Sequence, residues 1–190
     1  KIIAIKHANN EDYWIIVRTG YYSDNEIYSY LVTEEGIDLD NPVISESIVN
    51  FNDPTIWSGL GEPGQAKASI DGSKIAMAYY KVDYTEIFDF NNSTGECSNP
   101  IRIIDAGAPS PNESMTYAAD FEHYGIEFSP DGNLLYLSIE QGDLLQYNLI
   151  SGSESEINNS VITIDSNDWG GRGTLQLGPD GKIYVAKYLY

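Results

Sequence analysis

The chain has 190 residues, of which 42% are hydrophobic, so it can fold around a sizeable core and is not expected to be disordered. Its 29 acidic residues outnumber 10 basic ones, and the resulting formal net charge of −19 argues against nucleic acid and anionic lipid as partners. The single cysteine excludes an intrachain disulfide, and without an apolar run of about 18 residues no transmembrane helix is predicted.

The first predicted element is a hairpin over residues 5–17. Apolar runs flank Asn9-Asn10, and asparagine tolerates the positive φ that tight turns require. The same pattern returns three times with an Asp-Gly turn: Asp71-Gly72, Asp131-Gly132 and Asp180-Gly181. The four turns lie 62, 60 and 49 residues apart, intervals that are too uneven for a solenoid of uniform rungs but suit propeller blades with variable loops.

A second hairpin is predicted after each of the first three. Strand-like segments 26–32, 85–90 and 143–149 lead into polar turns containing glycine, and outer strands are expected at 43–49, 101–104 and 161–164. Four strands in roughly 50 to 60 residues is the pattern of a propeller blade. No segment combines helical periodicity with caps. We therefore predict an all-β chain, a β-propeller of four-stranded antiparallel blades present as about three blades plus part of a fourth.

The predicted organisation is a single partial propeller domain over residues 1–190. Its blades are expected at about 1–60, 61–120 and 121–170, with an incomplete one at 171–190. Because propellers have about four to eight blades, this chain cannot close a ring by itself. We expect it to belong to a longer protein, whose other domains are then among its partners. A proteolytic fragment and self-assembly from partial rings are the alternatives.

The inner strand of each blade lines the channel of a propeller, and its alternate residues share one face. Aligned on the turns, one set consists of Ile5, Lys67, Glu127 and Gln176. The other set is mostly apolar and is expected to pack between sheets: Lys6, Ala68, Phe128 and Leu177. We therefore predict that the first set faces the channel. There, Lys67, Glu127 and Gln176 would either bind a polar ligand or form a hydrated, hydrogen-bonded axis.

Residues just ahead of each inner strand are expected near the mouth of the channel, where propellers bind partners. They include Gln65, His123, Tyr124 and Arg172, and Trp169 belongs to the same loop as Arg172. An exposed tryptophan beside arginine and tyrosine suits recognition of a protein or a glycan. Alternatively, Trp169 packs between blades.

The sequence offers little for catalysis. Its two histidines, His7 and His123, are expected at opposite ends of the channel, which disfavours a histidine metal site or acid–base pair. No Gly-x-Ser-x-Gly nucleophile motif and no glycine-rich phosphate loop occur. Segment 89–100 resembles a calcium loop, but Thr94 and Pro100 stand where an EF-hand requires glycine and glutamate. We predict no catalytic residue, no metal and no cofactor, with a weakly bound structural calcium ion left open.

Four segments carry a resemblance that extends over most of the chain: 7–14 (HANNEDYW), 86–99 (EIFDFNNSTGECSN), 124–132 (YGIEFSPDG) and 175–186 (LQLGPDGKIYVA). Together they resemble the WD-repeat-like and lactonase-like propeller superfamily, in particular domains of secreted Bacteroidota proteins. The resemblance implies a large secreted or cell-surface protein, associated with the outer membrane. It also implies cargo of type IX secretion, linked to gliding motility.

These observations predict a non-catalytic recognition or scaffold module of a secreted or cell-surface protein, such as an adhesin. Its ligand would be a protein or a glycan bound at the channel mouth. The alternative is a propeller enzyme of lactonase or hydrolase type that uses channel carboxylates and a cation, with Glu127 as the first residue to test. A purely structural spacer is the third interpretation.

Overall fold

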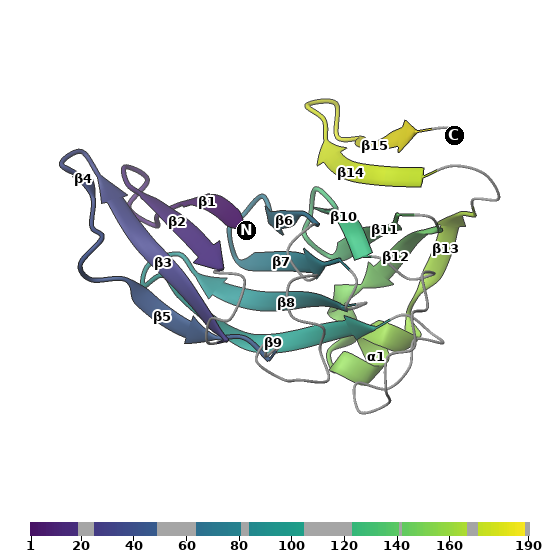
Figure 1. Ribbon diagram of the computed structural model, residues 1–190, viewed down its shortest axis with the longest axis horizontal. Helices are drawn as coiled ribbons and strands as arrows, with labels where there is room; N and C mark the ends of the chain where they lie inside the picture. Colours follow the sequence, from purple (N-terminus) through teal and green to yellow (C-terminus); the bar gives the residue numbers. More distant parts are fainter. Residues whose placement is uncertain are drawn as a thin grey trace.

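The computed structural model describes residues 1–18, 25–48, 64–80, 84–104, 123–140, 142–166 and 171–188. These residues form four antiparallel sheets that follow one another along the chain (Figure 1). The first three strands alternate buried with more exposed residues, as expected of a sheet with one covered face, whereas the central strands of the second sheet are buried almost throughout.

The first sheet contains β1 (Ile2–Lys6), β2 (Tyr13–Arg18), β3 (Glu26–Thr33), β4 (Gly36–Ile37) and β5 (Val43–Glu46), and both β4 and β5 pair with β3. The second sheet contains β6 (Ala66–Ala68), β7 (Lys74–Tyr79), β8 (Tyr84–Asn91) and β9 (Glu96–Ile104). The third contains β10 (His123–Phe128), β11 (Leu134–Ile139), β12 (Leu144–Asn148) and β13 (Ile162–Asp165). The fourth is the hairpin of β14 (Gly171–Leu177) and β15 (Ile183–Tyr188).

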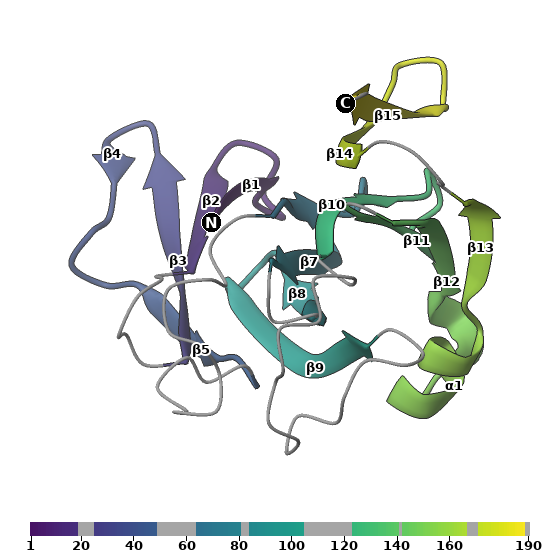
Figure 2. The same cartoon turned by 45° about the vertical axis from the view of Figure 1, so that its right-hand side comes forward.

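The first strands of the four sheets are neighbours in space. β1 contacts β6, β6 contacts β10, and β10 contacts β14, while the later strands of each sheet lie farther out (Figure 2). Sheets that repeat in this way, each with its first strand innermost, form a β-propeller. The predicted all-β propeller class is therefore confirmed.

The hairpin turns that revealed the repeat have one common geometry. The residue with positive φ is Asn10 (66°), Gly72 (69°), Gly132 (71°) or Gly181 (77°). The residue before it accepts a hydrogen bond from the backbone N–H two positions on, at 3.1 Å for Asp71 and at 3.0 Å for Asn9. Asn9-Asn10 is thus equivalent to the Asp-Gly turns, because asparagine can supply both the acceptor and the left-handed backbone.

Two apolar cores lie between successive sheets. Trp14 and Ile16 of the first sheet pack with Ile75, Met77 and other side chains of the second sheet, and all four residues are at most 5% exposed. The opposite face of the second sheet packs against the third, where the fully buried residues include Ala76, Ile103, Ile126, Leu135 and Leu137. Sheet-on-sheet burial of this kind is the main stabilising contribution in an all-β chain.

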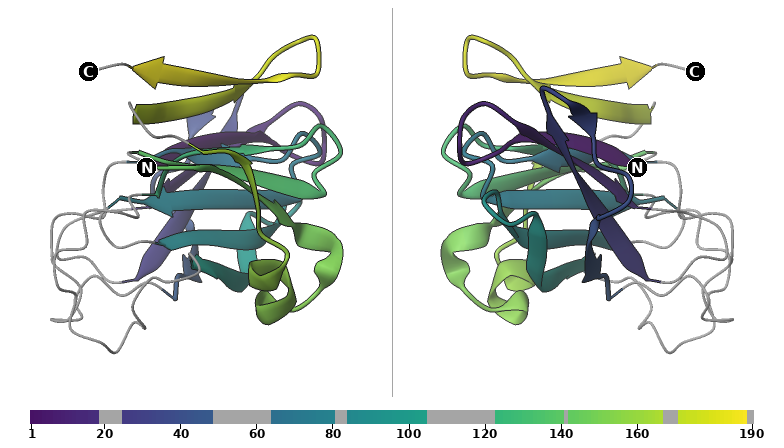
Figure 3. Two further views of the ribbon diagram at one scale, coloured as in Figure 1. Left: turned by 90° about the vertical axis from the view of Figure 1, so that its right-hand side faces the viewer. Right: turned by 90° about the vertical axis from the view of Figure 1, so that its left-hand side faces the viewer.

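The predicted channel position of Ile5 is wrong. Ile5 is 5% exposed and belongs to the core between the first two sheets. Lys6, expected to pack between sheets, is exposed instead, whereas its equivalent Phe128 is buried against the second sheet. The reason is that no described sheet covers the outer face of the first one, which also exposes Ile2 and Tyr13 (Figure 3).

The structure also contains helical segments that we did not predict. A 3₁₀ turn, η1 (Leu149–Ser151), and a short helix, α1 (Glu154–Asn159), connect β12 to β13. Ser153 and Glu156 form a capping box at the start of α1, a signal that was present in the sequence. Within the described part of the chain, no helix has the length and apolar character needed to cross a membrane.

Candidate functional site

Three of the predicted channel residues come together. Lys67 of β6, Glu127 of β10 and Gln176 of β14 occupy equivalent positions on successive inner strands, just ahead of the hairpin turns. Lys67 Nζ lies 2.9 Å from Glu127 Oε2 and 2.9 Å from Gln176 Oε1. We call these three residues the channel cluster. Strand alternation places them on the same face, because each lies the same number of residues ahead of its turn.

Glu127 is held by several donors. The residue is 5% exposed, and its Oε2 accepts from Lys67 Nζ and from the Leu177 N–H at 2.8 Å. Its Oε1 accepts from the Phe128 N–H at 3.1 Å. A buried carboxylate needs such partners, because charge without a partner is costly to remove from water. The cluster therefore holds an ionised glutamate against a charged lysine.

Lys67 retains hydrogen-bonding capacity. An ammonium group has three N–H donors, and those of Lys67 have two acceptors among the described residues, Glu127 and Gln176. Its side chain is 17% exposed, and Gln176 is exposed. The cluster can thus donate a charge-assisted hydrogen bond to an oxygen atom of a ligand in the channel.

Gln65 also connects the inner strands β6, β10 and β14, through hydrogen bonds separate from those of the channel cluster. Its Oε1 accepts from the N–H of Ile126 at 3.1 Å and from that of Leu175 at 2.8 Å, and its Nε2 donates to the Leu175 carbonyl at 3.2 Å. The sequence placed Gln65 ahead of an inner strand but showed nothing of this role. Only the approach of β10 to β14 reveals it.

His123 does not lie in an open channel mouth. It is fully buried, and Thr85 Oγ1 lies 3.0 Å from its Nδ1. Burial in a poorly solvated site lowers the pKa of His123 to about 3, with a smaller opposing contribution from a backbone hydrogen bond at Tyr84. A histidine that stays neutral and buried suits a structural role, so the predicted ligand contact is not supported by this geometry.

Arg172 is likewise withdrawn from solvent. It is 1% exposed, and its guanidinium lies 2.8 Å from Asp165 Oδ2 and donates to the carbonyl of Gly142. Lys187 approaches the same carboxylate at 2.8 Å, and these two cations lower the pKa of Asp165 to about 2. Arg172 therefore fixes the fourth sheet to the third.

Of the other two residues predicted at the channel mouth, only Tyr124 is among the described residues. Tyr124 is half-buried, and its ring meets that of Tyr80 edge to face with centroids 6.0 Å apart. Trp169 lies outside the described residues. The structure thus gathers Lys67, Glu127 and Gln176, and it shows no hydrogen bond from them to the described side chains of His123, Tyr124 and Arg172.

The channel cluster does not fit a metal ion. Glu127 is its one carboxylate, and the Lys67 ammonium already occupies the position beside it that a cation would take. Across the described segments, no group of three histidine, cysteine, aspartate or glutamate side chains could hold a metal. The chemistry that the cluster itself offers is hydrogen bonding and charge stabilisation by Lys67.

Comparison by sequence finds no matching protein family and no matching curated protein. Comparison by structure finds propeller proteins. A 6-phosphogluconolactonase, so named, from Bacteroides fragilis aligns with a TM-score of 0.56 at 12% identity, over 97% of this chain and 46% of that one. A protein of the same description from Bacteroides uniformis gives 0.52 at 16% identity, over 98% and 46%.

A third similar structure is the periplasmic gluconolactonase of Pseudomonas aeruginosa. Its TM-score is 0.52 at 14% identity, with 98% of this chain and 49% of that chain covered. The chain thus spans about half the length of the solved structures that it matches. At these identities the likeness shows the β-propeller fold.

The comparisons correct our view of activity. The prediction of a non-enzyme is contradicted, because these neighbours are named as lactonases, in line with the alternative that the sequence left open. A WD-repeat identity, type IX secretion, gliding motility and an adhesin role receive no support from them. The resemblance to β-propeller proteins is the part that is confirmed.

Proposed function

We propose that this chain forms part of a propeller hydrolase that opens lactones of sugar acids. The observation that carries the proposal is the channel cluster, in which Lys67 is fixed by Glu127 and Gln176 and keeps a donor available at a partly exposed position. The names of the structural neighbours support the same class of substrate. The P. aeruginosa protein is named as periplasmic, and we propose a location outside the cytoplasm here as well.

The reaction needs little from the protein beyond charge stabilisation. Water adds to the lactone carbonyl carbon and loses a proton to solvent, while the carbonyl electrons move to oxygen. The Lys67 N–H stabilises this oxyanion. The carbonyl then reforms, the ring C–O bond breaks with its electrons going to the ring oxygen, and that oxygen takes a proton from solvent. The product is the hydroxy acid, so one water is consumed for each lactone.

Glu127 is a positioning residue in this scheme. Its ion pair with Lys67 holds the amine in place, and its hydrogen bond from the Leu177 N–H fixes the direction of the pair. We propose an unphosphorylated lactone, because Lys67 is the one cation in the cluster and the chain carries a net charge of −19.

The test is hydrolysis of glucono-δ-lactone followed by acid release, with the uncatalysed rate subtracted. Lys67→Met is expected to lower kcat by about 10²- to 10³-fold, as loss of one oxyanion donor does elsewhere. Lys67→Arg should retain part of the rate, and Glu127→Gln should lower kcat because the amine is then no longer held in place. Lys182→Met is the matched control, since that lysine is highly exposed on the fourth turn.

Two results would overturn the proposal. One is that the protein containing this chain hydrolyses no sugar lactone faster than buffer does. The other is that Lys67→Met, shown by circular dichroism to be folded, retains full activity.

A further inference from the structure

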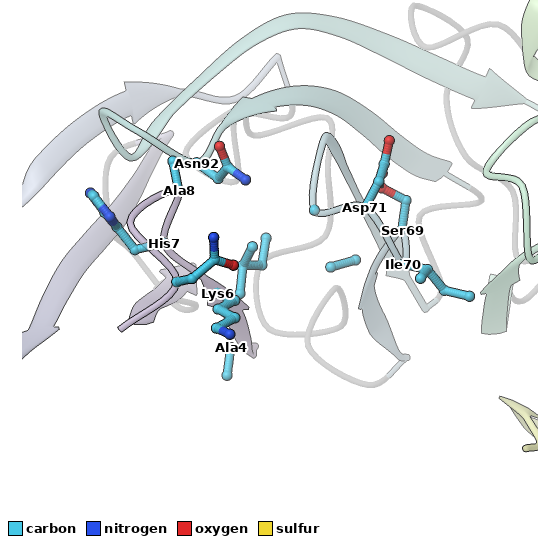
Figure 4. Close-up of a pocket in the computed structure, with 12 residues that line it drawn as sticks. Ala4, Lys6, His7, Ala8, Ser69, Ile70, Asp71 and Asn92 are labelled. Carbon is cyan, nitrogen blue, oxygen red and sulfur yellow. The ribbon is translucent and has the colours of Figure 1, made fainter. Parts of the chain in front are cut away.

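A second recess lies away from the channel cluster, where the turns of the first two sheets face each other. It has a volume of about 440 Å³. Lys6, His7, Ala8 and Asn92 border one side and Ser69, Ile70 and Asp71 the other (Figure 4). Pockets that hold small molecules commonly measure about 300–1,000 Å³. The recess is therefore large enough for a ligand of one ring.

The walls of this recess are fixed by contacts between sheets. The backbone carbonyl of Asn92 accepts from Trp14 Nε1 at 2.9 Å and from the Ala8 N–H at 3.1 Å. Gly72 allows the turn of the second sheet to approach β1 of the first, because a Cβ at that position would lie 2.9 Å from Ile5 Cγ2. The position of Asn92 is thus set by its backbone, which leaves its side chain available.

Several polar groups at the recess are not used by the fold. The Lys6 amine and the carboxamides of Asn10 and Asn92 make no hydrogen bond to any described residue. Nδ1 of His7 accepts from the Asn9 N–H at 3.0 Å, so the neutral ring carries its proton on Nε2 as a donor. These groups come from two sheets and border one space.

We propose that this recess binds a polyhydroxylated molecule of monosaccharide size. A carboxamide both donates and accepts, which matches hydroxyl groups that do the same. Ile70, which is 67% exposed, and Ala68 supply apolar surface for the C–H face of a sugar ring. Lys6 is the one cation of the lining and the Asp71 carboxylate opposes it, a balance that disfavours a phosphorylated ligand.

This site is separate from the proposed hydrolytic one. Ala68 faces the recess, whereas its neighbour Lys67 faces Glu127 and Gln176, because adjacent residues of β6 point to opposite sides. The inference therefore does not depend on the proposed function, and substitutions can separate the two.

Titration calorimetry and saturation-transfer NMR with glucose, galactose, mannose and xylose test the proposal. Asn92→Ala and Asn10→Gly are each expected to weaken binding of the bound sugar by about tenfold or more. The glycine variant keeps the positive φ that Gly72 and Gly132 adopt in the equivalent turns. Asn159→Ala, on the exposed side of α1, is the matched control and should leave affinity within about twofold.

The two sites give different readouts. Lys67→Met and Glu127→Gln should leave sugar affinity unchanged, and Asn92→Ala should leave lactone hydrolysis unchanged. Sugar binding that survives both asparagine substitutions would overturn the inference, as would the absence of binding at about 10 mM of every sugar. Binding of phosphate or gluconate without any neutral sugar would also overturn it, because charge at Lys6 would then account for recognition.

Discussion

Lys67 and Glu127 lie 60 residues apart in the sequence, and yet Nζ of one is 2.9 Å from Oε2 of the other. Each belongs to the inner strand of a different sheet, and each has little exposed surface, 17% and 6% of the side chain. Their contact joins the second sheet to the third at the channel, so its removal should affect stability as well as any activity.

Lys67→Met should lower the free energy of unfolding by about 2 kcal/mol, because Glu127 keeps its charge in a buried site without its cation. The value is below that of a fully buried pair since Lys67 retains some solvent. Urea denaturation of the variant, of Glu127→Gln and of the double variant measures it. The pair is not stabilising if the loss of unfolding free energy in the double variant equals or exceeds the sum of the losses in the two single variants.

Gln65→Ala should cost about 1–3 kcal/mol, because it leaves the N–H groups of Ile126 and Leu175 without their acceptor. Gln146→Ala is the control: that side chain is also half-buried but makes no hydrogen bond to a described residue, so a change within about 0.5 kcal/mol is expected. Equal losses in thermal unfolding for the two variants would contradict this role of Gln65.

Gly125→Ala should be strongly destabilising, by about 3 kcal/mol or more, because its Cβ would lie 2.3 Å from the Gly173 carbonyl oxygen and 2.6 Å from Ser138 Oγ. Gly173→Ala is the matched control from the facing strand, where the new Cβ would meet Ala186 at 3.6 and 3.7 Å, an ordinary contact. The yield of folded protein and the melting temperature should separate the two variants. A stable Gly125→Ala protein would show that β10 and β14 do not approach so closely.

His123 should make stability depend on pH in the acidic range. Its folded pKa of about 3 is below the ordinary value of 6.5, so between these values the unfolded chain binds a proton that the folded chain does not. Stability is therefore highest above pH 6.5 and falls as the pH drops toward 3, by up to about 1.4 kcal/mol per pH unit.

The measurement is chemical denaturation of wild type and His123→Gln at several pH values. The variant should show a shallower decline below pH 6.5, and His7→Gln, which retains His123, should keep the steeper one. Parallel curves for wild type and His123→Gln would contradict a buried neutral histidine.

Part of the candidate site was predictable because it depends on local chain geometry. Asp71, Asp131 and Asp180 mark tight turns through their own backbone and side-chain preferences, and Asn9 does so in the first repeat. Counting back from these turns placed Lys67, Glu127 and Gln176 on one face, since strand residues alternate with a period of two. The capping box at Ser153 was equally local, although no helix was predicted there.

The remaining features depend on which sheet lies beside which. Nothing near Arg172 or His123 in the sequence indicates that each is buried, and Gln65 gains its partners from strands 61 and 110 residues away. Ile5 and Lys6 exchanged their expected environments because, among the described sheets, the second covers one face of the first and none covers the other. The turns, the strands and the propeller class were thus predictable from the sequence, because they depend on short-range backbone preferences. The tertiary structure decided burial, ion pairing and the two candidate sites, because these depend on contacts between segments far apart in the chain.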